Sequence, residues 1–215
     1  MLGMARNMRL SINPMSLDIS PDIRTGGNPL ISWGRARFAY GDCIVAASRG
    51  VLCWLDIAPG VAAADSLLQH FSAFELEQNN ALVQAVLDES FAAVARGDEL
   101  QLSASGTEFQ LQVWRALAQI EPGECETYGQ LAARIGRPGA ARAVGSAAAA
   151  NVIALFIPCH RLVPASTAGE SGRSGGAYRW GAALKQKLLE AERGAHINSI
   201  YGHYGTNKGI ELCIS

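Results

Sequence analysis

The segment Pro158-Cys159-His160-Arg161 places a cysteine beside a histidine, two residue types that can carry covalent chemistry. A thiolate is a strong nucleophile, and histidine is the side chain that most often accepts the proton of such a group. The apolar run Ala154-Leu155-Phe156-Ile157 predicts a buried strand that leads into the cysteine. Because neighbouring side chains on an extended segment point to opposite sides, we expect a bridging water to carry the thiol proton to His160. The opposing interpretation is an ordinary core cysteine, since cysteine is among the most frequently buried residues.

Glu192 is a candidate third member of this group. The residues from 182 to 193 predict a helix with Leu184 and Leu188 on its core side, and Glu192 lies one turn beyond Leu188 on that side. An inward carboxylate is rare unless it is paired, and a histidine is its natural partner. The alternative is that Glu192 belongs to a frayed helix end.

The elements that must position these residues divide into two parts. Residues 1–31 and 195–215 lack periodicity and predict flexible tails. Residues 32–102 predict a scaffold domain, in which alternating polar and apolar residues indicate a small antiparallel sheet followed by two helices. The expected strands cover residues 35–40, 43–48 and 51–57, with a tight turn at 48–50, and the expected helices cover residues 65–77 and 80–96.

Residues 103–194 predict a mostly helical second domain. Thr107 with Gln110, and Thr127 with Gln130, have the spacing of capping boxes and predict helix starts. The second of these helices, residues 128–135, is followed by a glycine-bearing turn and by another helix over residues 140–150. Helix, short turn and helix is the pattern of a helix-turn-helix.

The helix over residues 140–150 has an unusually bare face. At 100° per residue, Arg142, Gly145, Ser146 and Ala149 share one side, so that a single long side chain stands among small ones. Such a face permits close approach to a nucleic-acid groove, and its lack of long polar side chains predicts largely sequence-independent binding. The alternative is an alanine-rich helix packed inside the protein, which gives Arg142 no place.

Charge and cysteine usage narrow the class of protein. Residues 1–127 carry a net charge of −7 and residues 128–193 a net charge of +6, a division that fits either polyanion binding or a solvated surface. The five cysteines and four histidines show no zinc-ligand spacing, which predicts reduced thiols in the cytoplasm and no metal site. No apolar run approaches the roughly 20 residues that span a bilayer, and no secretory signal is expected at the N-terminus.

The motif Pro158-Cys159-His160-Arg161, with Arg142-Ala143-Val144-Gly145 and Asn151 upstream, resembles the O6-alkylguanine-DNA alkyltransferases, the methylated-DNA–protein-cysteine S-methyltransferases. The likeness runs from about residue 35 to residue 193 and is strongest over 107–161. The runs at 38–43 and 176–181 resemble the C-terminal half of the bacterial adaptive-response alkyltransferase in particular. That protein's separate zinc-bearing domain is not expected here, and alkyltransferase-like proteins without the reactive cysteine are excluded by Cys159.

The resemblance implies an α/β fold with a ribonuclease-H-like N-terminal sheet and a winged-helix-like C-terminal domain. It implies a monomer that needs no cofactor and acts on double-stranded DNA containing O6-alkylguanine. Each molecule would act once, because the base is flipped out of the duplex and its alkyl group passes irreversibly to Cys159.

The resemblance also assigns roles to individual residues. His160, oriented by Glu192, would draw off the thiol proton through a water, and we expect this charged surrounding to lower the thiol pKa. Asn151 would link the recognition helix to the strand before the cysteine. Two residues would act on the DNA at the lesion: Arg142 would replace the flipped base, and Tyr128 would press on the phosphate and donate a proton to the departing guanine. The small residues of the helix, Gly145, Ser146 and Ala149, would lie in the minor groove. The guanine pocket would be lined by Leu162, Tyr178 and Trp180.

Two features depart from the family pattern. The loop at 164–177 is longer than expected, and Arg179-Trp180 are bulky where some relatives have small residues. From Trp180 we expect methyl to be preferred over bulky aromatic adducts. Two other functions remain open from the residues alone: a cysteine hydrolase with a Cys-His-Glu triad, which would turn over, and a non-catalytic helix-turn-helix regulator, which would not need Cys159.

Overall fold

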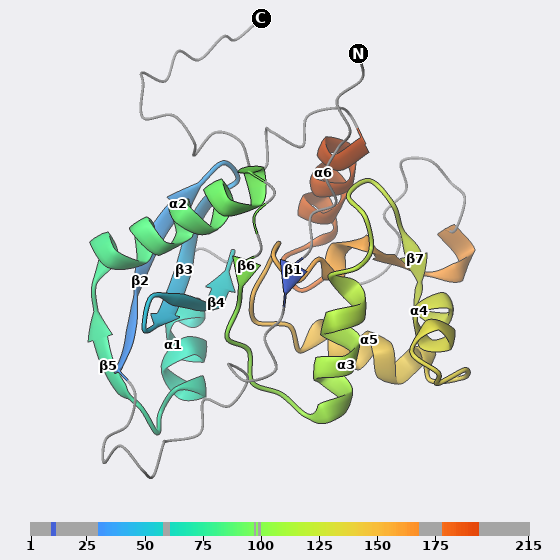
Figure 1. The fold of residues 1–215 in the computed structure, drawn as a ribbon, viewed down its shortest axis with the longest axis horizontal. Helices are drawn as coiled ribbons and strands as arrows, with labels where there is room; N and C mark the ends of the chain where they lie inside the picture. Colours follow the sequence, from blue (N-terminus) through green and yellow to red (C-terminus); the bar gives the residue numbers. More distant parts are fainter. Residues whose placement is uncertain are drawn as a thin grey trace, which may run out of the picture.

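The computed structural model describes residues 10–11, 30–57, 61–96, 98, 100–167 and 178–193 (Figure 1). The expected tails at 1–31 and 195–215 lie outside the described residues, apart from the strand residues Leu10–Ser11 and Leu30–Ile31. The fold is mixed α/β, as predicted: a sheet with helices forms the N-terminal part, and a mostly helical part follows it.

Four strands form the main sheet, in the order β4-β3-β2-β5. Strands β2 (Leu30–Phe38), β3 (Gly41–Ser48) and β4 (Val51–Asp56) form the predicted antiparallel meander, and β2 is longer than its alternating pattern indicated. Gly50 has φ of 78° in the predicted turn between β3 and β4, a backbone conformation that glycine adopts without steric cost. The core side chains of β3 and β4 are almost completely buried.

The helix predicted over residues 65–77 is correct only in its first part. Helix α1 covers Val61–His70, and Glu75–Gln78 instead forms β5, which pairs in parallel with the edge of β2. Phe71 and Phe74 satisfy a helical pattern, but they reach the core from a turn in which the Phe74 N–H donates to the Phe71 carbonyl. Pairing with an open sheet edge therefore outweighs local helical periodicity here.

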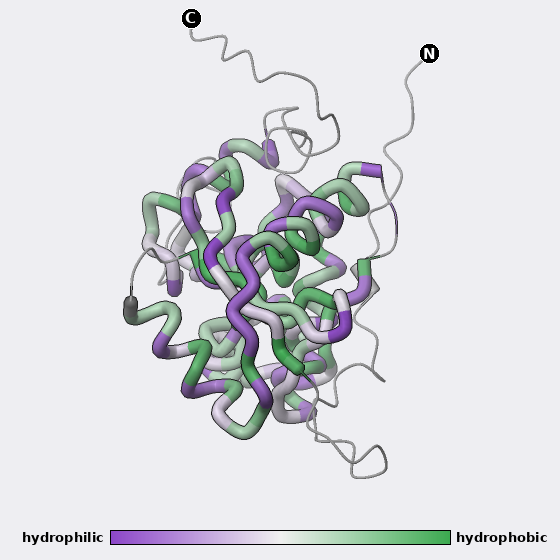
Figure 2. Tube along the Cα trace, turned by 90° about the vertical axis from the view of Figure 1, so that its left-hand side faces the viewer, coloured by the Kyte–Doolittle hydropathy of each residue, from purple (hydrophilic) through white to green (hydrophobic). Residues whose placement is uncertain are grey.

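Helix α2 (Asn80–Arg96) has the predicted bounds and packs against β2, β3 and β4 (Figure 1). Its buried residues meet the core side chains of the sheet; among these, the Phe91 ring stacks on Phe38 with centroids 6.0 Å apart. Figure 2, viewed from the β5 side, shows hydrophobic and hydrophilic stretches alternating along the chain, as expected of elements with one buried face.

The helical part begins after the short strand β6 (Leu100–Gln101), which pairs in parallel with β1 (Leu10–Ser11). Both predicted capping boxes are present, Thr107 opening α3 (Glu108–Leu117) and Thr127 opening α4 (Tyr128–Arg134). Helix α4 and α5 (Ala141–Ala149) form the helix-turn-helix, and α3 packs across α5, where the Trp114 indole donates to the Ala147 carbonyl. The remaining elements are β7 (Glu126–Thr127), β8 (Leu162–Val163), the 3₁₀ helices η2 (Cys159–Arg161) and η3 (Ala165–Thr167), and α6 (Ala182–Arg193).

The strand predicted over Ala154–Ile157 is wrong. Ile153 forms a single parallel bridge with Leu55, and the chain then turns, with Leu155 at a left-handed φ of 67°. Asn151 holds this turn from both ends, because its side chain accepts from the Ile153 N–H and donates to the Ile157 carbonyl. A buried side-chain amide thus supplies the hydrogen bonds that a neighbouring strand would otherwise provide.

Candidate active site

Cys159 is the first residue of η2, directly after Pro158, and its side chain is buried. The amide of Asn151 that holds the preceding turn also donates to Cys159 Sγ at 3.2 Å. Asn151 is itself fully buried. One side chain therefore fixes both the backbone that leads to the thiol and the sulfur atom, so the expected link through Asn151 runs to a turn and not to a strand.

His160 and Glu192 lie together, as the sequence predicted. His160 Nε2 is 2.9 Å from Glu192 Oε1, and both side chains are at most 1% exposed. A carboxylate only accepts hydrogen bonds, so Nε2 carries the hydrogen and Nδ1 is left as the basic nitrogen. Nδ1 is buried and has no hydrogen-bond partner within the described part of the chain.

Arg161 joins this pair, a contact that the sequence analysis missed. Its guanidinium donates from Nε and Nη2 to the Glu192 carboxylate, at 3.1 Å and 2.8 Å respectively, and from Nη1 to the Ile120 carbonyl. Arg161 is almost completely buried, so Glu192 compensates a cation as well as orienting an imidazole. Inside the protein such a bidentate pair is stable only while both partners are present.

The turn at Gly123 closes the other side of Glu192. The Gly123 N–H donates to Glu192 Oε2 at 3.2 Å, and Gly123 has φ of 84°. A Cβ at this position would stand 3.1 Å from the Glu192 carbonyl oxygen, which is closer than most such contacts. Glycine therefore allows the turn after α3 to approach the end of α6.

The proton affinities define the resting state of these groups. Burial opposes the ionisation of Glu192, but the hydrogen bonds and charges of His160 and Arg161 outweigh it and lower the pKa of Glu192 to about 2. Burial lowers the pKa of His160, against the opposite effect of Glu192. The couple is therefore a neutral imidazole that donates to a carboxylate at neutral pH.

The expectation of a lowered thiol pKa is wrong for the resting protein. Burial raises the pKa of Cys159 to about 11, although the Asn151 hydrogen bond and the charges of Lys185 and Arg179 act to lower it. Desolvation of a thiolate outweighs these contributions because the thiol is buried. The thiol is therefore neutral until a base removes its proton.

Lys185 is a functional candidate that the sequence analysis did not identify. It is completely buried on α6, and its Nζ donates to the Leu162 carbonyl at 2.6 Å. Burial lowers the pKa of Lys185, while the Cys159 charge acts to raise it. A signal was available in the sequence, because Lys185 lies three residues before Leu188 and seven before Glu192 and therefore shares their helix face.

Two aromatic side chains, Tyr128 and Tyr178, lie near the reactive group, and a third, Trp180, packs against Tyr178. Burial and the Cys159 charge raise the pKa of Tyr128, which keeps its hydroxyl protonated at neutral pH. The Tyr178 ring lies edge-on to His160 and to Trp180, with centroids 6.4 Å and 5.2 Å away. The Leu162 side chain is completely buried in the core, and the contribution to the pocket expected of Leu162 is that of its backbone.

Helix α5 presents the predicted bare face. Arg142, Ser146 and Ala149 are exposed, and Gly145 is half-buried where its backbone faces the Tyr128 ring. Val144 and Ala148 are buried on the opposite side. The alternative of an entirely internal helix is therefore wrong.

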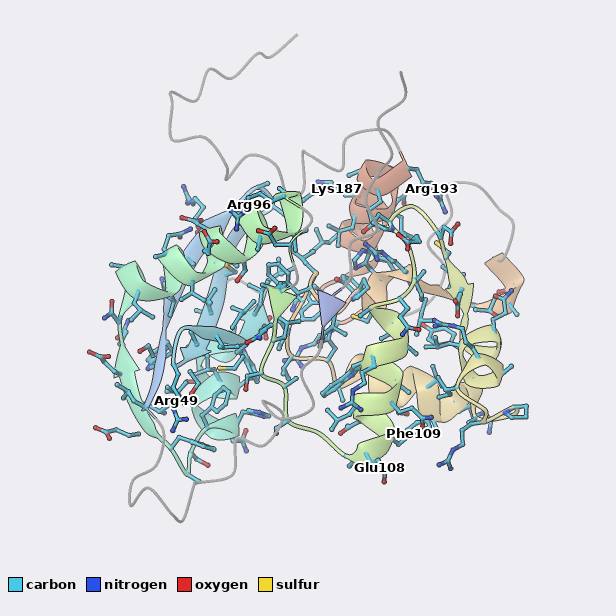
Figure 3. All side chains as sticks on the ribbon, viewed as in Figure 1. Arg49, Arg96, Glu108, Phe109, Lys187 and Arg193 are labelled. Carbon is cyan, nitrogen blue, oxygen red and sulfur yellow. The ribbon has the colours of Figure 1, made fainter. Side chains whose placement is uncertain are left out.

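The described basic residues of 128–193 are divided between the interior and the surface of the protein. Arg161 and Lys185 are buried, while Arg134 and Arg179 pair with acidic side chains. Lys187 and Arg193 lie along the upper side of the molecule in Figure 3, with Arg96, whereas α5 lies in its lower half (Figures 1 and 3). The net charge of residues 128–193 therefore includes buried and paired cations as well as exposed ones.

Metal-binding clusters and membrane-spanning helices are both absent from the described residues. They contain no group of three or more histidine, cysteine, aspartate or glutamate side chains that could hold a metal ion. Among the same residues, no helix has both the length and the apolar character needed to cross a membrane.

Comparisons with known proteins agree with this geometry. Residues 108–194 match the family described as "6-O-methylguanine DNA methyltransferase, DNA binding domain". The chain is 40% identical over 174 residues to the Regulatory protein ada of Salmonella typhimurium, a match that covers 78% of this chain and 47% of that protein. It is 41% identical over 129 residues to a methylated-DNA–protein-cysteine methyltransferase of Mycobacterium leprae, covering 58% of this chain and 73% of the relative.

A solved structure shares the fold. The crystal structure of Mycobacterium tuberculosis OGT in complex with DNA matches with a TM-score of 0.57 and 31% identity, over 75% of this chain and 92% of that one. The chain spans about half the length of the Salmonella relative and of the Escherichia coli Ada protein. The matches together show that the chain belongs to the methylated-DNA–protein-cysteine methyltransferase family.

Proposed function

We propose that this protein repairs DNA by transferring the methyl or other alkyl group of O6-alkylguanine to its own Cys159. The observation that carries the proposal is a buried thiol next to a histidine whose Nε2 binds Glu192 and whose Nδ1 remains basic. The names of its relatives support the same reaction.

The proton and electron movements follow from the resting state. His160 Nδ1 accepts the thiol proton through a water, and the resulting imidazolium is stabilised by the Glu192 carboxylate. The Cys159 thiolate then displaces the alkyl carbon: the new S–C bond forms as the C–O6 bond breaks, and the electron pair leaves with the guanine. Tyr128, which is protonated, donates to the departing base. Because a thioether is stable, each molecule acts once.

The substrate must reach a buried sulfur, which a stacked base cannot do. We propose that α5 lies in the minor groove with Gly145, Ser146 and Ala149 against it, and that Arg142 occupies the space of the everted base. Tyr178 and Trp180, with the backbone at Leu162, would receive the base. The position of Tyr178 beside His160, and of Trp180 beside Tyr178, supports this assignment.

The finer assignments are part of the same proposal. Residues 32–102 would form a ribonuclease-H-like scaffold and residues 103–194 a winged-helix-like DNA-binding domain, with residues 1–31 and 195–215 as flexible tails. The protein would act as a cytoplasmic monomer without a cofactor. The meander with its parallel edge strand β5, and the pairing of β7 with β8 beside the helix-turn-helix, support the two topologies.

Mass measurement of the intact protein tests the reaction. After incubation with a duplex containing one O6-methylguanine, we expect one added methyl group, and peptide mapping is expected to place it on Cys159. The variant Cys125→Ser is expected to react normally, and Cys159→Ser is expected to gain no mass. An unchanged mass for the unsubstituted protein would contradict the proposal.

The same assay distinguishes the two alternatives. A cysteine hydrolase would release product repeatedly and keep a free thiol, whereas a DNA-binding regulator would bind the duplex with no chemical change. Arg142 lies on the exposed face of α5, and the buried residues of α5 belong to the same hydrophobic core as Cys159. This connection between a DNA-facing helix and the thiol favours a reaction on DNA over either alternative.

A further inference from the structure

Asp56 is an acidic residue at the end of β4 that neither the sequence pattern nor the proposed reaction uses. It is the last residue of β4 and is only 4% exposed. A carboxylate this deeply buried requires hydrogen-bonding partners. Its partners come from the segment just before α6, far away in the sequence. Arg179 Nη2 donates to Oδ2 at 3.1 Å, and Trp180 Nε1 donates to Oδ1 at 2.7 Å.

The Arg179 guanidinium is held on two further sides. Its Cζ lies 5.8 Å from the centroid of the Trp54 ring and 5.6 Å from that of Trp180, so the cation has an indole from β4 and one from its own turn as neighbours. Cation–π contacts of this kind add to the charge pairing with Asp56. We call Trp54, Asp56, Arg179 and Trp180 the aspartate clamp.

The aspartate clamp contacts the residues that hold the reactive sulfur. Arg179 Nη1 donates to the Asn151 carbonyl at 3.5 Å, and the Asn151 side chain donates to Cys159 Sγ. Trp180 packs against Tyr178, which in turn lies edge-on to His160. The residue before Asp56 also bonds this region, since the Leu55 N–H donates to the Val152 carbonyl and its carbonyl accepts from Ala154.

We propose that Asp56 is a positioning residue that sets which alkyl groups the site accepts, by fixing Trp180 beside Tyr178 and Arg179 beside Asn151. The inference rests on the proposed alkyl transfer. With both carboxylate oxygens engaged, Trp180 keeps one orientation against Tyr178, which lies edge-on to His160. Loss of the carboxylate frees the indole to rotate, which admits larger groups more than it affects methyl.

Two ratios test this role. The first compares the rate of transfer from duplexes containing O6-benzylguanine and O6-methylguanine. The second compares mapped labelling of Cys159 by N-pyrenylmaleimide and by iodoacetamide, and does not depend on alkyl transfer. In Asp56→Ala we expect both bulky-to-small ratios to rise about tenfold, the lower range of discrimination by one pocket contact.

Asp56→Asn keeps an acceptor for Trp180 but loses the charge that pairs with Arg179, so its ratios are expected to fall between those of the parent and Asp56→Ala. If Asp56→Ala fails to fold, the two ratios of Asp56→Asn test the positioning role in its place. The matched control is Asp42→Ala, which removes an exposed aspartate paired with Arg37 on the same sheet and is expected to change neither ratio. A purely structural aspartate would lower both rates together and leave the ratios constant.

The outcomes separate the two proposals. If no methyl is transferred by the parent protein but the labelling ratio rises in the Asp56 variants, the proposed function fails and the positioning role stands. If both ratios are unchanged in folded Asp56→Asn and Asp56→Ala, the positioning role is refuted, whether or not the protein transfers methyl groups.

Discussion

Replacing Glu192 by glutamine tests the buried network at its centre. The carboxylate accepts hydrogen bonds from His160, Arg161 and the Gly123 N–H. A glutamine keeps the shape but has one acceptor oxygen and an NH₂ group, which must face a donor of either the imidazole or the guanidinium. The change also leaves the buried Arg161 cation without its counter-charge.

The structure sets the size of this effect. Folding lowers the pKa of Glu192 from an ordinary 4.5 to about 2. At about 1.4 kcal/mol per pH unit, this difference corresponds to about 3 kcal/mol of folding free energy at neutral pH. The value agrees with the roughly 3–5 kcal/mol expected when one partner of a buried ion pair is removed. Because folding lowers the pKa of this acid, the stabilisation is complete above pH 4.5 and disappears as the pH falls through about 2.

Urea unfolding of the parent and of Glu192→Gln, measured from neutral pH down to pH 2, provides the assay. We expect the difference in unfolding free energy to be about 3 kcal/mol at pH 7 and to shrink between pH 5 and pH 2. The double variant Arg161→Met, Glu192→Gln removes both charges and is expected to regain much of the stability, while methyl transfer stays slow because His160 is not oriented. A loss below about 1 kcal/mol at pH 7 would refute this coupling of Glu192 to His160 and Arg161.

Three further predictions concern the thiol and the DNA face. Arg142→Ala is expected to slow methyl transfer from duplex DNA, while changing stability by no more than about 0.5 kcal/mol and leaving iodoacetamide labelling of Cys159 intact; a parallel loss of thiol reactivity would contradict this role. Asn151→Ala is expected to destabilise the protein by about 2–4 kcal/mol, since it leaves buried groups at both ends of a turn unpaired, and urea unfolding measures this. Because the Cys159 pKa is about 11, iodoacetamide labelling of Cys159 is expected to keep rising with pH beyond pH 9. Lys185→Met is expected to slow this labelling at each pH, because loss of the Lys185 charge raises the Cys159 pKa. A plateau in labelling near pH 8 would show that the thiol is more acidic than its burial indicates.

Local signals in the sequence determined most of the secondary structure. Capping boxes at Thr107 and Thr127 are short-range hydrogen-bond patterns, so they predicted the starts of α3 and α4 correctly. Alternation and helical periodicity likewise predicted the β-meander, α2, α5 and α6. The inward position of Glu192 followed from the same periodicity, because a helix face fixes where a side chain points. Its pairing with His160 was expected because a buried carboxylate needs a partner.

Tertiary structure decided what depends on distant partners. Ala154–Ile157 has the composition of a strand, but it turns because the Asn151 side chain bonds both of its ends. Residues 75–78 continue a helical pattern, yet they pair with the open edge of β2. The acidity of the Cys159 thiol, the buried cations Arg161 and Lys185, and the contact of Asp56 with Arg179 and Trp180 depend on desolvation and on residues far apart in the chain. The sequence by itself therefore determined which groups are available for chemistry, whereas the packed structure determined their charge and their neighbours, because burial and long-range contact have no local signal.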